Sequence, residues 1–94
     1  MTLKKIAFHA EAVNIAIIEL RDAALECCAL KGQKHAVGSI CTAIATLIAG
    51  AGAHGSTEQL RVMDLANSHG FRPEYYGGGI RVEFDKEHNA AKAE

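Results

Sequence analysis

Two residues in the middle of the chain have the chemistry of a thiol catalytic pair. Cys41 follows His35 by six residues. A thiolate is the reactive form of cysteine, and a nearby imidazole can take its proton or hold it as an ion pair. Ser39 can cap a helix that begins at Ile40, which would put Cys41 in the first turn, where free N–H groups and the helix dipole lower a thiol pKa. Cys41 and His35 are therefore the candidate nucleophile and base.

The same cysteine also has a plainer interpretation as a small packing residue on an apolar helix. Cys27 and Cys28 are adjacent and point in different directions, so we interpret them as packing residues too.

A zinc site needs three or four converging ligands, usually with closely spaced pairs, and the remaining histidines are scattered: His9, His54, His69 and His88. Gly77-Gly78-Gly79 joins two expected strands instead of opening a helix, so it is not a phosphate loop. We expect no metal and no cofactor.

Length and composition predict one small globular domain spanning residues 1–94. A chain of this size buries only about 60–65% of its unfolded surface, so self-association would hide more apolar surface. Hydrophobic residues make up 49% of the chain, and 10 basic residues face 11 acidic ones. That balance disfavours nucleic-acid binding. No apolar run reaches the ~20 residues of a membrane span. With no recognisable leader and an odd number of cysteines, a cytoplasmic protein is expected.

Residues 3–31 allow two predictions. Apolar residues recur there at steps of three and four, as on one helix face: Leu3, Ile6, Ala10, Val13, Ile17, Leu20, Ala24 and Cys27. Against this, residues 14–20 form a compact β-branched run, and Arg21-Asp22 can turn it into a second strand ending near Gly32. The sequence leaves a long helix and a hairpin open, with residues 1–14 as an N-terminal extension in the second case.

The rest of the chain predicts two helices and a hairpin. After a polar loop at 32–35, a helix over 40–49 ends in a glycine loop, and Ser56 or Thr57 caps a second helix over 57–68. Its inner face is expected to hold Leu60, Met63 and Leu65 or Ala66. Residues 71–85 alternate like a half-buried β-hairpin around three glycines. Residues 86–94 form a polar tail, either a frayed helix or disordered. The expected fold is a small two-layer α+β domain.

Four segments together resemble the ribosomal-processing cysteine protease (Prp) family. Ile17-Ile18-Glu19-Leu20-Arg21-Asp22 resembles the family's opening strand and turn, and Lys34-His35-Ala36 resembles its histidine motif. Residues 40–47 resemble the helix that opens on the catalytic cysteine, and residues 72–82 resemble the closing hairpin. The resemblance implies a homodimer with His35 as base, Cys41 as nucleophile, and a β-hairpin over residues 14–32. It also implies substrates that are short N-terminal extensions of a ribosomal protein or of phage structural proteins.

The sequence alone leaves two main functions open, beside a weaker third one, a small-ligand-binding oligomer that uses Tyr75 or Tyr76 and the glycine loops. One is a Prp-like cysteine endopeptidase, or an inactive relative, of bacterial or phage type. The other is a non-enzymatic interaction or inhibitor module, of the kind found in phages and mobile elements, that acts through helix and hairpin surfaces. Both imply a protein or peptide partner, without nucleic acid or membrane.

Overall fold

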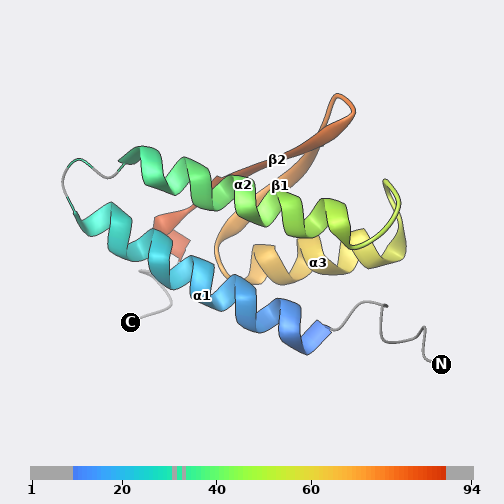
Figure 1. Ribbon diagram of the computed structural model, residues 1–94, viewed down its shortest axis with the longest axis horizontal. Coiled ribbons are helices and arrows are strands. Elements are labelled where there is room, and N and C mark those ends of the chain that lie inside the picture. The colour runs from blue at the N-terminus through green and yellow to red at the C-terminus, as the bar shows by residue number, and fades with distance from the viewer. Residues whose placement is uncertain (1–9, 31, 33, 89–94) are drawn as a thin grey trace.

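In the computed structural model, which describes residues 10–30, 32 and 34–88, three helices pack with one β-hairpin. The helices are α1 (Ala10–Ala29), α2 (Lys34–Gly50) and α3 (Thr57–Ser68), and the strands are β1 (Phe71–Tyr76) and β2 (Gly79–Phe84). α1 and α2 run side by side, with α3 and the hairpin behind them (Figure 1). The α+β fold class predicted from the sequence is confirmed.

Of the two structures predicted for residues 3–31, the helix is observed: Ala10–Ala29 form α1, as the apolar periodicity indicated. Ile17 and Ala24 are fully buried, and Val13 and Leu20 pack beside them on the same face of α1. A helix brings this spacing to one face, where it contacts α2 and α3. The hairpin over residues 14–32, which the protease resemblance implied, is therefore wrong. Residues 10–14 belong to the first helix, and the rest of the expected extension, residues 1–9, lies outside the described residues.

The second helix begins earlier than the sequence pattern predicted. We expected residues 40–49 with a cap at Ser39, but α2 runs from Lys34 to Gly50, so the loop expected at 32–35 includes two helical residues. Ser39 is inside the helix and exposed, and the Thr42 hydroxyl donates to the Gly38 carbonyl one turn back. Val37 packs against the core from this added turn, and this contact stabilises the longer helix.

The third helix has the bounds that capping predicted. Ser56 is the N-cap, and its side chain accepts from the backbone N–H of Gln59 at 3.2 Å. The predicted inner face is partly wrong, because Leu60 is 52% exposed whereas Gln59 and Val62 are buried. Ala66 is buried as expected. Met63 and Leu65 also pack against the core, so Leu60 is the one wrong residue of the predicted inner face.

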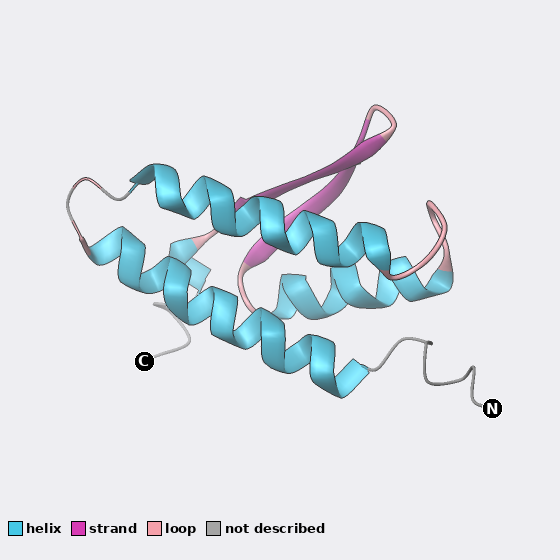
Figure 2. Cartoon of the chain, viewed as in Figure 1, coloured by secondary structure: helices cyan, strands magenta, loops and turns pink. Residues whose placement is uncertain are grey.

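The predicted hairpin is confirmed, and its register is set by a two-residue turn. Tyr76 faces Gly79 across Gly77-Gly78, and Gly77 alone of the turn residues has positive φ, at 61°. Positive φ at the first central position is typical of a type II′ turn, which matches the twist of two paired strands. The turn projects beyond the helices (Figure 2). Of the predicted tail, residues 86–88 form a helical turn, and residues 89–94 lie outside the described part.

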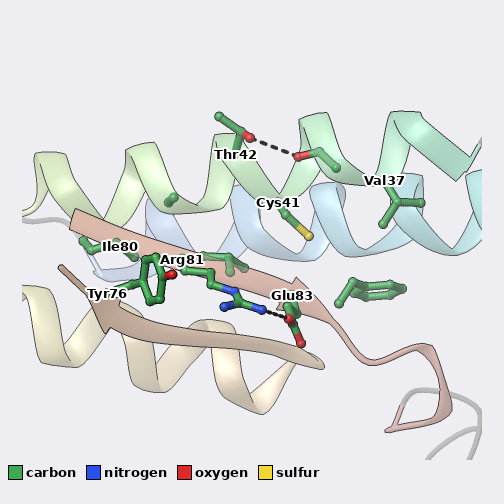
Figure 3. Close-up of a pocket in the computed structure, with 11 residues that line it drawn as sticks. Val37, Cys41, Thr42, Tyr76, Ile80, Arg81 and Glu83 are labelled. Atoms are coloured by element: carbon green, nitrogen blue, oxygen red, sulfur yellow. Dashed lines mark hydrogen bonds and ion pairs between the residues drawn. The ribbon is translucent and has the colours of Figure 1, made fainter. Parts of the chain in front are cut away.

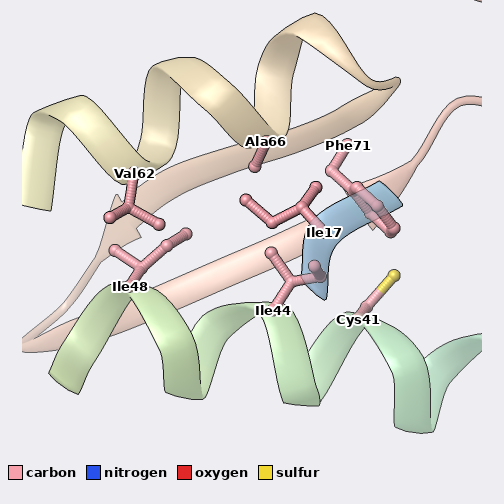
Figure 4. Packing of buried hydrophobic residues seen from close by; sticks show 7 residues of the cluster. All are labelled: Ile17, Cys41, Ile44, Ile48, Val62, Ala66 and Phe71. Atoms are coloured by element: carbon pink, nitrogen blue, oxygen red, sulfur yellow. The ribbon is translucent and has the colours of Figure 1, made fainter. Parts of the chain in front are cut away.

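One apolar cluster joins helices and hairpin. Its buried members come from every helix and from β1 (Figure 4): Ile17, Cys41, Ile44, Ile48, Val62, Ala66 and Phe71. β1 packs on α3, and β2 packs on α2. The hairpin is thereby held with β2 next to the helix that carries Cys41.

Candidate functional site

The two candidate catalytic residues lie on one helix but apart from each other. His35 is the second residue of α2, whereas Cys41 is six residues further along. Six helical residues span about 9 Å and turn the side chain about 120° away. His35 is exposed and Cys41 is buried, and the two side chains share no hydrogen bond in the described structure. No short contact therefore lets His35 take a proton from Cys41 in this conformation.

The thiol of Cys41 also lacks the environment that would activate it. Cys41 lies in the third turn of α2, beyond the N-terminal N–H groups that were expected to stabilise a thiolate. It is only 8% exposed. Burial, with smaller effects from the negative charge of Glu83 and from Cys28, raises the pKa of Cys41. The thiol is therefore neutral at physiological pH and packs as part of the core.

This environment predicts slow chemistry at Cys41. Iodoacetamide should label Cys41 more slowly than the exposed Cys28, and labelling should rise only at pH values above those of an ordinary thiol, because a raised pKa moves thiolate formation to higher pH. The profile should be unchanged in His35→Ala. Peptide mapping by mass spectrometry assigns the rate to each cysteine. Fast labelling near neutral pH that slows in His35→Ala would instead establish the catalytic pair.

Cys41 also contributes to the wall of an open groove between α2 and the hairpin. The groove, here called the α2–β2 groove, has a volume of about 630 Å³. Its helix side consists of Val37, Gly38, Cys41, Thr42 and Ala45, and its hairpin side of Tyr76 and residues 80–84. Figure 3 shows Cys41 pointing from α2 toward the strand, and Arg81 and Glu83 joined on the strand's outer face. The helix side is built from short side chains, so the groove runs close to the α2 backbone.

The groove follows an open backbone edge. Residue pairs of an antiparallel ladder alternate between hydrogen-bonded and non-bonded, and the turn makes Tyr76 and Gly79 the bonded closing pair. Val82, opposite Pro73, is then in a non-bonded pair. Its N–H and C=O point away from β1, as do those of Ile80 and Phe84. Among the described residues the sheet has two strands only, and none of them pairs with this edge of β2.

Charged side chains cover the outer face of the hairpin beside this edge. Arg81 donates to Glu83 at 2.6 Å, and its Nε lies 3.8 Å from a carboxylate oxygen of Glu74. The Arg81 guanidinium also lies over the ring of Tyr76, which is 65% exposed. On the inner face, Ile80, Val82 and Phe84 pack against the core. The open edge of β2 therefore presents its free N–H and C=O groups between the charged outer face and the apolar inner face of the hairpin.

Neither a metal site nor a membrane-spanning helix is found in the described part of the chain. No group of three or more histidine, cysteine or acidic side chains is placed to hold a metal ion there. Its helices also include none with the length and apolar character needed to cross a bilayer. The α2–β2 groove was not predicted from the sequence. The one available signal was the alternation of residues 80–84 in a hairpin that has no third strand in sequence.

Comparison with known proteins adds no further site. No family model, no curated protein and no solved structure matches the chain, and the likeness to the ribosomal-processing cysteine proteases rests on the four quoted segments alone.

Proposed function

We propose that this chain is a non-enzymatic interaction module that binds an extended segment of a protein partner in the α2–β2 groove. The observation that carries the proposal is the open edge of β2 alongside a groove whose other wall is made of short side chains. Strand addition is a common mode of peptide recognition: backbone hydrogen bonds at a free edge give affinity, and alternate side chains enter neighbouring pockets.

The chemistry of the two faces supports this mode of binding. A strand added to β2 would place every second side chain beside Ile80, Val82 and Phe84 on the inner face. The side chains between them would lie near Arg81 and Glu83. A bound segment should therefore alternate apolar residues with charged ones. The three free cysteines support a cytoplasmic site for this interaction.

The protease alternative has less support. Acyl transfer by a cysteine needs an accessible thiolate, a base within hydrogen-bond reach and N–H donors for the oxyanion. Cys41 is buried with a raised pKa, His35 lies on a different side of α2, and N–H groups in the helix interior are used within the helix. The groove residues need none of these properties to bind a peptide.

A displayed random-peptide library tests strand addition directly. We expect selected peptides to bind the parent protein and to lose at least about tenfold in affinity for Val82→Pro, since proline removes an edge N–H and blocks the approach of a strand. Val82 faces Pro73 in a non-bonded pair, so the substitution removes no N–H used by the hairpin. Affinity is measured by isothermal titration calorimetry, with circular dichroism as the check on folding.

A matched control substitutes Val62→Ala, which alters the core at α3 and leaves the edge unchanged. It should lower stability and keep peptide affinity. Failure to select any binding peptide, or peptides that bind Val82→Pro as well as the parent, would contradict the proposed function.

A further inference from the structure

We propose that the segment bound at the open edge of β2 is the β2 strand of a second copy of this chain, so that two hairpins form one four-stranded antiparallel sheet. This inference rests on the proposed function, because it names the partner of the same edge. It is drawn from the order of residues in Ile80-Arg81-Val82-Glu83-Phe84 and from the register of the hairpin. This segment is complementary to itself when it runs antiparallel.

Backbone geometry permits a twofold axis at Val82. Val82 directs its N–H and C=O to the open edge, so Val82 of each copy can exchange both hydrogen bonds with Val82 of the other. The same register pairs Ile80 with Phe84 of the second copy, and these residues also direct their backbone groups outward. A twofold axis through a bonded pair is one of the two symmetric arrangements that an antiparallel ladder allows, and it makes the contact isologous.

The charges on the outer face match in this register. Arg81 lies opposite Glu83 of the second copy, and Glu83 lies opposite Arg81 of that copy. Within each hairpin Arg72 already faces Glu83, and Glu74 faces Arg81. Across four strands the rows therefore read Arg72, Glu83, Arg81, Glu74, with every neighbour of opposite sign. Opposite charges directly across a strand pair stabilise a sheet, and like charges destabilise it.

The inner face and the groove are complementary as well. Val82 meets Val82, and Ile80 meets Phe84, which extends the row of partly buried apolar side chains that packs on α2. The helix wall beside this edge carries Gly38, Thr42 and Ala45. Short side chains there allow the second copy to approach closely and add contact area beyond the strand edge itself.

The test uses charge reversal with reconstitution, read by sedimentation equilibrium. We expect the parent to form a dimer of twice the 10.0 kDa chain mass. Arg81→Glu places Glu against Glu across the axis, and Glu83→Arg places Arg against Arg, so each variant alone should dissociate at least about tenfold more readily. Mixed in equal amounts, the two variants pair Glu with Arg at both positions, and dimers should return.

The matched control for Glu83→Arg is Glu26→Arg, which makes the same charge change at an exposed position on α1. This control should dimerise like the parent. Recovery in the mixture separates interface repulsion from misfolding, because two misfolded chains would not restore each other. A parent that stays monomeric to about 1 mM, or a dimer that both charge variants leave unchanged, overturns the homotypic pairing. Peptide binding at the groove is decided separately by the library experiment.

Discussion

Phe71→Ala should lower the free energy of unfolding by about 3–5 kcal/mol, the largest single loss we expect in this chain. Phe71 is fully buried, and its ring lies 5.0 Å from that of Phe84, centroid to centroid. It is the first residue of β1 and follows the end of α3 after His69 and Gly70, so it joins the hairpin to the core of the helices. Truncation removes the aromatic contact and leaves a cavity where the two layers meet.

Urea denaturation followed by circular dichroism measures this loss, and Leu60→Ala is its control. Leu60 is 52% exposed on α3, so its truncation should change stability by less than about 1 kcal/mol. A small domain is only marginally stable, and Phe71→Ala should therefore be largely unfolded at 37 °C. A loss below about 1 kcal/mol would show that the hairpin and the helices are not joined through Phe71.

Gln59→Ala should cost about 2–3 kcal/mol, a large effect for a polar residue. Gln59 is only 3% exposed and is the buried polar residue of the described core. Its Oε1 accepts from the Tyr75 hydroxyl at 2.8 Å and from the Gly55 N–H at 3.0 Å, and its Nε2 donates to the Gly52 carbonyl at 3.2 Å. These bonds link α3 to β1 and to the loop before α3. Removal of the amide leaves a cavity in the core, takes the donor from the Gly52 carbonyl and takes the acceptor from the Tyr75 hydroxyl, while the Gly55 N–H keeps its second bond to Tyr75.

Two further variants separate hydrogen bonding from packing at Gln59. Gln59→Met keeps most of the side-chain volume and should retain most of the loss, because the Gly52 carbonyl and the Tyr75 hydroxyl lose their bonds to the amide. Tyr75→Phe removes one hydroxyl and should cost about 1 kcal/mol, since Gln59 keeps its bonds to Gly52 and Gly55. Thermal unfolding by calorimetry ranks the three. If Gln59→Met were as stable as the parent, the network would contribute little beyond filling space.

Local signals in the sequence predicted the elements whose ends are fixed by local chemistry. Ser56 caps α3 through a side-chain hydrogen bond, and Gly77 supplies the positive φ of the hairpin turn. Both depend on residues close in sequence, so both were predicted correctly. The start of α2 was missed because Gly38-Ser39 reads as a helix boundary, whereas packing of Val37 on the core extends the helix across it.

The site was less predictable than the elements. The pairing of His35 with Cys41 assumed that a loop separated them, and the longer α2 places them on different sides of one helix. The α2–β2 groove arises from the docking of β2 against α2, two elements separated in sequence by α3 and β1. No spacing rule along the chain reports such contacts. The burial of Gln59 could likewise not be predicted from the sequence, because its hydrogen-bond partners come from a loop and from a strand.

Pro73 would limit how far the proposed assembly through the hairpin could proceed. It lies opposite Val82 at a non-bonded position, so its nitrogen is on the outer margin of β1, where it has no hydrogen to donate. A hairpin with two open margins can recruit one copy on each side and grow into a fibril. Here one margin is closed by a residue of the strand itself. In the proposed dimer, growth would therefore end after a single pairing event, without extension into larger aggregates.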